Sequence, residues 1–310
     1  MGWIKKKLFG ISLEETRFDR RGFEGGDRRV RERIGQIGAS FVEGYHAALL
    51  DDEPERLAER LRQFPAELQG FLFEGAAMGL VVADFTSPWR PSRFRQFLAG
   101  PGEPHAYVVH IGAGWALARL PVRLERATQG FDPLLRWLAL DGYGFHQGYF
   151  HWRRFIAERE IPKNLSAYGR CAFDQGLGRS LWFVMAGDPG RVAAAIAGFD
   201  PPRRTHLWSG VGLACAYAGG VEGSALETLR DLSGGFLPAL QQGTAFAAKS
   251  RQRAGNPAAH TGLACGIVCG CDADQAAAVT DRALDGLPGD GELPAYEIWR
   301  RRIQSAFATT

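Results

Sequence analysis

The pentapeptide Phe-Val-Glu-Gly-Tyr at residues 41–45 recurs along this 310-residue chain and indicates how it folds. It returns as Phe-His-Gln-Gly-Tyr at residues 145–149 and, more weakly, as Leu-Gln-Gln-Gly-Thr at residues 240–244. The triplet Phe-Glu-Gly at residues 73–75 returns in the same order as Asp-Gln-Gly at residues 174–176. Matching shifts of about a hundred residues predict a duplicated unit of that length, with a shorter and more diverged third copy.

The sequence between these landmarks indicates helices almost throughout. Strand-like alternation bounded by hairpin turns is nearly absent, and prolines fall at breaks that divide each copy into four helical segments. Helical units of this kind bury their apolar faces against one another. We therefore predict an all-α helical repeat protein with a single domain at residues 34–310, in which three four-helix units span about 34–125, 133–220 and 224–307. A short, basic N-terminal arm at residues 1–33 precedes this domain.

The composition excludes several classes of function. Lysine and arginine (37) barely exceed aspartate and glutamate (34), and a net charge of +3 is too small to indicate a nucleic-acid partner. Hydrophobic residues make up 45% and charged residues 23%, which is typical of a globular chain. No apolar run is long enough for a membrane span, and the start does not have the pattern of a secretory signal. Five cysteines form no disulfide framework, so we expect a cytoplasmic protein.

Glycine is the outlier, with 40 of the 310 residues against a usual share of about 7%. Many of these glycines lie one helical turn from another small residue, a spacing that lets the backbone of a neighbouring helix approach closely. We expect such contacts at Gly75 with Gly79, at Gly176 with Ser180, and along Gly262, Gly266 and Gly270.

Residues 107–114 (YVVHIGAG) look like the beginning of a dinucleotide-binding fingerprint. That fingerprint needs a small residue three positions after the second glycine, and position 117 is Leu117. The same Gly-x-Gly pattern recurs with the repeat at Gly210 and Gly212. We interpret both copies as sites of helix packing.

The densest polar and aromatic stretch, at residues 141–152, contains two histidines. In the repeat comparison His146 and His151 align with Val42 and Ala47, so both are additions to the scaffold. Each is either an interior, hydrogen-bonded histidine or a catalytic one. Residues five apart point about 140° apart around a helix, which disfavours a shared metal ion.

Two charged residues replace apolar ones inside one predicted helix. Asp174 takes the place of Phe73, and Arg179 takes that of Met78. Buried charges are costly unless they are paired or used, which leaves either a structural ion-pair network or an acid–base site. We expect Arg170 to pair with Asp174 and to leave Arg179 free for a substrate oxygen. The predicted catalytic residues are Asp141, His146, Asp174 and Arg179.

Two other groups of residues carry open alternatives. Cys265 and Cys269, with His260 nearby, could bind a metal ion, but their spacing matches no zinc pattern and cysteine is also a common core residue, so we assign no metal site. The arm at residues 1–33 has ten basic and six acidic residues and is either mobile in solvent or in contact with an anionic membrane or a partner. Four apolar residues, Trp3, Ile4, Leu8 and Phe9, surround Lys5, Lys6 and Lys7 and could make such a contact.

The stretches at residues 141–150 (DGYGFHQGYF) and 174–183 (DQGLGRSLWF) resemble the signature segments of a bacterial family of unassigned function. Members of that family are encoded beside enediyne polyketide synthases in natural-product gene clusters. The resemblance extends from about Leu8 to the last predicted helix. It implies a role in forming or maturing the enediyne core, next to a synthase that produces a linear polyene. It implies no reaction type and supplies no catalytic residues.

Two functions are therefore expected from the sequence. The first is an enzyme of enediyne biosynthesis that acts on the polyene-derived intermediate in an apolar groove. The second is a non-catalytic polyene-binding chaperone, or a scaffold for membrane-bound partners of the pathway that docks through the arm. No cofactor is assigned, and the substrate class is a polyene or polyketide-derived small molecule. The residues expected to bind it are Tyr149, His151, Trp152, Gln175 and Trp182.

Overall fold

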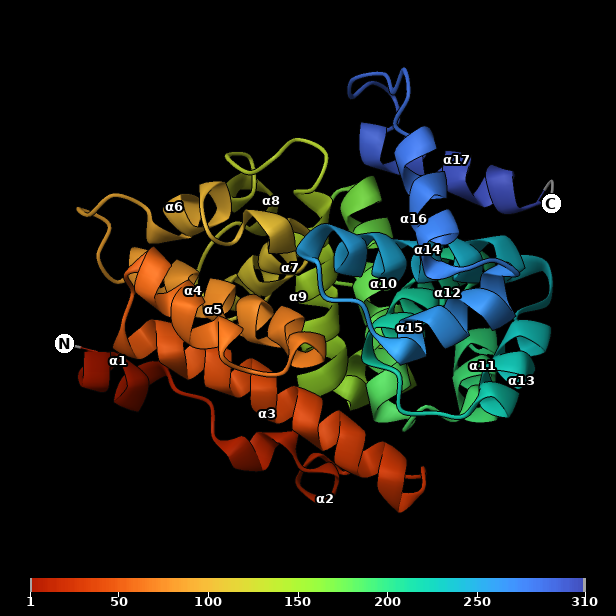
Figure 1. Cartoon of the computed structure of the whole chain (residues 1–310), viewed down its shortest axis with the longest axis horizontal. Coiled ribbons are helices and arrows are strands. Elements are labelled where there is room, and N and C mark those ends of the chain that lie inside the picture. Colours follow the sequence, from red (N-terminus) through yellow and green to blue (C-terminus); the bar gives the residue numbers. More distant parts are fainter. Residues whose placement is uncertain (1, 309–310) are drawn as a thin grey trace.

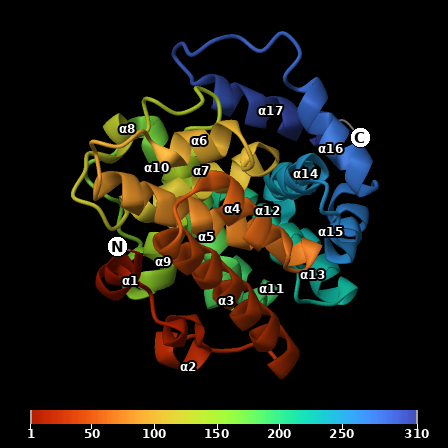
Figure 2. The same cartoon turned by 60° about the vertical axis from the view of Figure 1, so that its left-hand side comes forward.

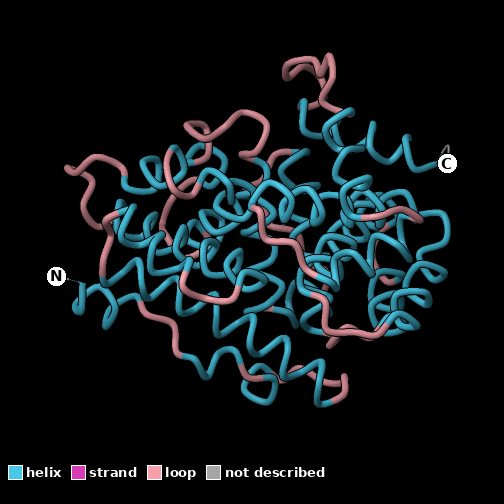
Figure 3. Tube along the Cα trace, in the orientation of Figure 1, coloured by secondary structure: helices cyan, strands magenta, loops and turns pink. Residues whose placement is uncertain are grey.

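The computed structural model describes residues 2–308 and confirms the predicted all-α class (Figure 1, Figure 3). No strand occurs within that range. The α-helices are α1 (Gly2–Phe9), α2 (Phe18–Arg21), α3 (Arg28–Leu50), α4 (Pro54–Arg62), α5 (Ala66–Phe85), α6 (Arg93–Ala99), α7 (Ala106–Leu117), α8 (Leu124–Ala127), α9 (Trp137–Phe150), α10 (Ala167–Val184), α11 (Pro189–Ala197), α12 (Pro201–Ala218), α13 (Gly223–Ser233), α14 (Leu237–Ala254), α15 (Ala259–Ala264), α16 (Ala273–Arg282) and α17 (Ala295–Ala308). Short 3₁₀ or π turns lie between them at Leu13–Thr16, Glu103–His105, Arg153–Ala157, Gly234–Phe236 and Cys265–Cys269.

The core is a row of helices in which α3, α5, α7, α9, α10, α12 and α14 each pack on the next. The row curls, because α5 also meets α12 and α14. The rings of Phe71 and Tyr217 lie 5.2 Å apart, and Arg251 donates a hydrogen bond to the carbonyl oxygen of Glu67. The helices α1 and α2 lie on one side of this row, and α16 and α17 lie on the other (Figure 1, Figure 2). By length and composition α5 could cross a membrane, but 78% of its apolar window is buried, as expected of a core helix.

Consecutive core helices touch backbone to backbone through glycines. A Cβ atom added to Gly176 of α10 would lie well under 3.0 Å from the carbonyl oxygen of Asp141 on α9, and one added to Gly144 of α9 would meet Phe173 of α10 in the same way. These reciprocal contacts explain why the chain needs so much glycine, because a side chain at either position would push the two helices apart. They recur between α3 and α5 (Gly44, Gly75), α7 and α9 (Gly114, Gly142), α10 and α12 (Gly178, Gly210), and α12 and α14 (Gly212, Gly243).

The unit that these contacts define is one core helix. A Gly-x-Gly motif lies in α7, α9, α10 and α12, and its first glycine faces the preceding helix while its second faces the following one. The copy at residues 112–114 is buried in the middle of α7, which confirms helix packing there. The predicted three four-helix units are not confirmed. Gly148 faces the following helix α10, whereas Gly243, its counterpart in the sequence comparison, faces the preceding helix α12.

Two of the three predicted small-residue contacts are confirmed. Gly75 and Gly79 meet the backbone of α3, and Gly176 meets that of α9. The third is wrong, because a Cβ atom added to Gly262 or Gly266 would have no heavy atom within 4 Å. These glycines lie at the surface, in α15 and the π turn after it.

The N-terminal segment is packed against the core. Residues 10–26, which we call the N-terminal strap, connect α1 to the start of α3 and contact the end of α9. The Arg21 guanidinium donates hydrogen bonds to the carbonyl oxygens of Tyr149 (2.9 Å) and Phe150 (2.7 Å), and the ring of Phe23 contacts that of Tyr149. The alternative of a mobile arm is therefore wrong for the strap.

Candidate functional site

A charged cluster lies in the interior between α5, α9 and α10. We call it the Arg179 centre, and its charged members are Arg179 of α10, Asp141 of α9 and Glu74 of α5, all buried. Arg179 donates a hydrogen bond of 2.5 Å to Oδ1 of Asp141, and its other terminal nitrogen lies 3.8 Å from Oε1 of Glu74. One guanidinium therefore faces two carboxyl groups away from solvent.

Neutral side chains hold the two carboxyl groups in place. The indole Nε1 of Trp115 on α7 donates to Oε1 of Glu74 at 3.1 Å. The amide of Gln175 donates to Oδ2 of Asp141 at 2.8 Å and to the hydroxyl of Tyr296 on α17 at 3.1 Å. Each carboxyl group thus has a fixed orientation, which acid–base chemistry requires.

Burial raises the pKa of Glu74 to about 7, although Arg179 opposes this rise. Burial also raises the pKa of Asp141, again against Arg179. Burial lowers the pKa of Arg179, but the attraction of Asp141 and Glu74 outweighs it and the net shift is upward. The single positive charge of Arg179 can neutralise only one carboxylate, and Asp141 is the carboxylate that it contacts directly. Glu74 is therefore the group that takes up and releases a proton near neutral pH.

We expect Glu74→Gln to stabilise the protein at high pH. The pKa of Glu74 is about 7 in the folded protein and about 4.3 in an unfolded chain. The folded protein therefore binds the Glu74 proton more tightly than the unfolded chain does. The stability that this proton contributes is fully present below about pH 4 and is lost as the pH rises through 7. Between pH 4 and pH 8 the free energy of unfolding of Glu74→Gln should rise relative to wild type by about 3 kcal/mol, as measured by urea titration. The same comparison for Glu59→Gln, an exposed residue, should show no such change, and an equal change in both variants would contradict the assignment.

An apolar cavity of about 50 Å³ lies beside the centre. Arg179 and Glu74 lie in its wall, and Arg179 with Phe71 and Phe183 also lines a second cavity of about 20 Å³ further inside. The strap forms part of the wall of the first cavity. The lining of the first cavity is Ile11, Glu15 and Thr16 of the strap, Ile34, Ile37, Gly38, Phe41 and Val42 of α3, and Phe71, Trp115, Phe145, Tyr149, Phe150 and Phe183.

The structure brings some predicted site residues together. Asp141, Gln175 and Arg179 belong to the Arg179 centre, and Tyr149 lines the cavity with its hydroxyl donating to the carbonyl oxygen of Glu15. Gln175 donates a hydrogen bond to Asp141 and does not line the cavity, and its contact with a substrate stays a prediction.

Asp174 is placed elsewhere, and the predicted pairing with Arg170 is wrong. Both carboxylate oxygens of Asp174 accept hydrogen bonds from Arg203 of α12, at 2.9 and 2.6 Å, and Arg170 is exposed. Asp174 lines neither cavity. The Asp174 carboxylate therefore forms an ion pair that links α10 to α12.

We expect Asp174→Asn to lower the free energy of unfolding by about 2 kcal/mol or more, because the amide can accept only one of the two hydrogen bonds from Arg203 and leaves that buried cation without a counter-charge. Arg170→Gln should change it by no more than about 0.5 kcal/mol, since that side chain is exposed. Chemical denaturation of the two variants measures both values. Equal losses of unfolding free energy in the two variants would indicate that Asp174 pairs with Arg170 after all.

The remaining predicted residues are separated from the centre. His146 is buried against the rings of Trp115 and Phe150, and its Nδ1 has no hydrogen-bond partner among residues 2–308. Burial lowers the pKa of His146 to about 3, so this ring is neutral. His151 lines an open surface groove between α9 and the segment before α10. Trp152 and Trp182 line neither cavity. The indole of Trp152 donates to the carbonyl oxygen of Arg21 in the strap, and that of Trp182 donates to the carbonyl oxygen of Gly219.

The cysteine cluster has no ligand geometry for a metal ion. Within residues 2–308 no group of three or more His, Cys, Asp or Glu side chains is placed to bind one. Cys265 is buried, and His260 lies against the carbonyl oxygen of Tyr217 and the guanidinium of Arg251.

Sequence reasoning missed Glu74, although a signal for it exists. Several core helices carry a buried polar residue directly before the glycine that contacts the preceding helix. Because this glycine fixes the closest approach of two helices, the residue before it lies near the same contact in each helix. These residues are Glu74, Asp141, Gln175, Ser209 and Gln242.

The fold and this site define an all-α protein with a buried arginine and two carboxyl groups beside an apolar cavity. The chain belongs to the family described as "Protein of unknown function (DUF1702)", whose model matches residues 1–307. No curated protein and no solved structure matches the chain. Membership of a family of unassigned function is thereby confirmed, and the enediyne setting stays a prediction.

Proposed function

We propose that this protein is an enzyme of enediyne biosynthesis that performs acid–base chemistry on a polyene-derived intermediate. The observation that carries the proposal is the pairing of Glu74, whose pKa burial raises to about 7, with Arg179 in the wall of an apolar cavity. A carboxyl group with a pKa near neutrality can both accept and donate a proton. An arginine beside it can hold the oxygen on which negative charge develops.

The chemistry that this arrangement suits is a proton-transfer isomerisation or cyclisation. Arg179 lies in the cavity wall, and its guanidinium has five N–H donors. One of them donates to Asp141, so other donors are left to bind a carbonyl or carboxylate oxygen of a substrate. Ionised Glu74 removes a proton from a carbon beside the conjugated chain, and the electron pair moves toward the oxygen held by Arg179. Glu74 then returns the proton at another carbon, so double bonds shift or a ring closes without oxidation or reduction. Trp115 fixes the direction in which Glu74 points.

The cavity must widen to admit such a chain. Its present volume of about 50 Å³ holds only a few water molecules, since each needs about 10–15 Å³ on this measure. The strap is the part of the cavity wall that is attached to the core through side-chain contacts. Arg21, for example, donates hydrogen bonds to the carbonyl oxygens at the end of α9. Displacement of the strap therefore gives a long apolar molecule access to the Arg179 centre.

The test is complementation of an in-frame deletion in the enediyne-producing strain, followed by mass spectrometry of polyene-derived compounds. Glu74→Gln should fail to restore the downstream product, and the exposed control Glu59→Gln should restore it fully. Both purified proteins should fold at pH 7 by circular dichroism. Full restoration of product by Glu74→Gln would reject the catalytic role.

The apolar lining of the cavity favours a second function, a non-catalytic chaperone that shields the polyene or a scaffold in the pathway. In that case Glu74→Gln restores product, whereas filling the cavity by Gly38→Phe abolishes it. Binding of the conjugated fatty acid parinaric acid, followed by its fluorescence, should be lost in Gly38→Phe and retained in Glu74→Gln. Membrane association through the N-terminal segment is part of either proposal.

A further inference from the structure

We propose that α1, the end of α3 and the loop between α5 and α6 form one face that docks on an anionic membrane surface. This inference rests on the membrane association proposed above and is independent of the chemistry at the Arg179 centre. The side chain of Ile4, one of the apolar residues named in the sequence, lies outside the described part of the structure.

Large apolar side chains of these three segments project into solvent. Trp89 of the loop is 79% exposed, Trp3 of α1 is 68% exposed and Leu8 of α1 is 71% exposed. Phe85 and Leu50, at the ends of α5 and α3, are also exposed. A shared surface hollow is lined by Leu50 and Trp89 together with Lys5 of α1, so the three segments adjoin. Exposed apolar groups gathered in this way indicate a surface that is covered in function.

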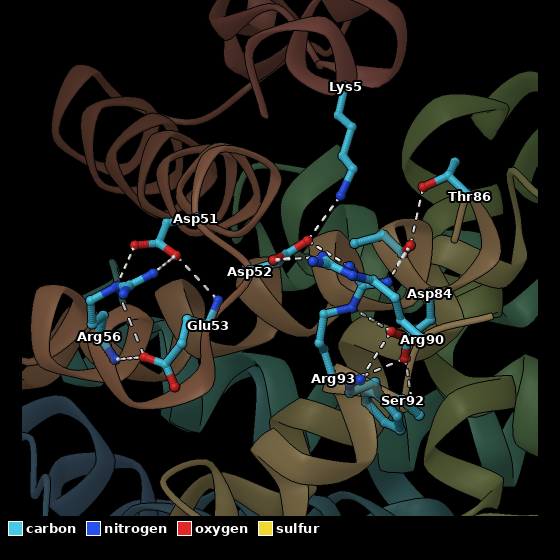
Figure 4. Close-up of polar contacts among 12 residues, drawn as sticks. Lys5, Asp51, Asp52, Glu53, Arg56, Asp84, Thr86, Arg90, Ser92 and Arg93 are labelled. Carbon is cyan, nitrogen blue, oxygen red and sulfur yellow. Dashed lines mark hydrogen bonds and ion pairs between the residues drawn. The ribbon is translucent and has the colours of Figure 1, made fainter. Parts of the chain in front are cut away.

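Ion pairs join the three segments into one unit (Figure 4). Asp52, which follows α3, forms ion pairs with Lys5 of α1 at 2.9 Å and with Arg93 of α6 at 2.6 Å. Arg93 also bonds to Asp84 of α5 at 3.0 Å, and Asp84 accepts the hydroxyl of Ser92 at 2.7 Å. Because Lys5 and Arg93 are largely buried, this network positions α1 beside the loop that carries Trp89.

The charged side chains of this face that remain available to a binding partner are lysines. The carboxylates of Asp52 and Asp84 are paired within the network, whereas no ion pair engages Lys6 or Lys7 among residues 2–308. Lys7 lies 5.4 Å from the centre of the Trp3 ring. Tryptophan with lysine is the combination found at the interface of anionic bilayers, where the ring enters the headgroup region and the ammonium meets lipid phosphate. A second copy of this chain would oppose the same positive charges and is a poorer occupant.

Co-sedimentation of the full chain with vesicles tests the proposal. The protein should bind vesicles of 30% phosphatidylglycerol in phosphatidylcholine and should bind pure phosphatidylcholine much less. The emission of Trp3 and Trp89 should shift to the blue on binding. Replacing Lys6 and Lys7 by glutamine should weaken binding about fivefold for each lysine, and raising the salt should have a similar effect. Trp3→Ser with Trp89→Ser should weaken binding at least tenfold.

Two variants at exposed leucines on other surfaces serve as controls. Leu232→Ser on α13 and Leu263→Ser on α15 should bind the vesicles as the wild type does. Equal binding to neutral and anionic vesicles, no binding to either, or a loss of binding in the controls would each overturn the proposal. A dimer in light scattering that Trp89→Ser dissociates would assign the face to a second copy. No substrate is needed, so these results stand apart from the Glu74 test.

Discussion

Replacing Gly176 with alanine should leave the protein without a stable fold. The added Cβ would lie well under 3.0 Å from the carbonyl oxygen of Asp141 and would also crowd the backbone nitrogen of Phe145. Both are backbone atoms of α9, so no side chain can rotate away, and the two central helices must separate. We expect a loss of at least about 3 kcal/mol, the upper end for overpacked cores, seen as a lost or much lowered thermal transition.

The matched control is the same substitution at Gly262. This glycine is also helical and is exposed, and a Cβ atom added there meets nothing within 4 Å. Gly262→Ala should be neutral or should stabilise α15 by up to about 1 kcal/mol, because alanine favours helices. If Gly176→Ala melted like Gly262→Ala, the close approach of α9 and α10 would not be a requirement of the fold.

Replacing Arg179 with methionine should destabilise the protein by about 3–5 kcal/mol at neutral pH. The sequence alone suggested an arginine left free for a substrate oxygen, but its guanidinium is hydrogen-bonded to Asp141 and lies 3.8 Å from Glu74. Without it, burial keeps the pKa of both carboxyl groups above their unfolded values. The variant should therefore be most stable below about pH 4 and lose stability as the pH rises, which denaturant titrations at pH 4 and pH 8 would show.

A neutral cluster provides the control for this prediction. Combining Arg179→Met with Asp141→Asn and Glu74→Gln removes every charge of the centre, so most of the lost stability should return at pH 8. No recovery in the triple variant would mean that Arg179 stabilises the fold by packing against Phe145, whose ring centre lies 4.9 Å from its guanidinium carbon.

The sequence by itself determined the helical class, the importance of glycine and the presence of unusual charges in the core. The Gly-x-Gly motifs and the glycine at position 75 could be read as helix contacts, because a residue without a side chain inside a helix is costly unless another backbone approaches it. Asp174 and Arg179 stood out for the same kind of reason, since buried charges need partners. These are local rules, and one chain is enough to apply them.

Only the tertiary structure decided which groups meet. Asp174 and Arg179 lie five residues apart on one helix and so face different neighbours, Arg203 of α12 and Asp141 of α9. The role of Glu74 depends on its being desolvated beside Arg179, a residue more than a hundred positions away along the chain. Sequence spacing fixes angles around one helix, whereas the partner across an interface depends on how the row of helices curls. That curl results from the summed packing of all the core helices, and no single stretch of sequence specifies it.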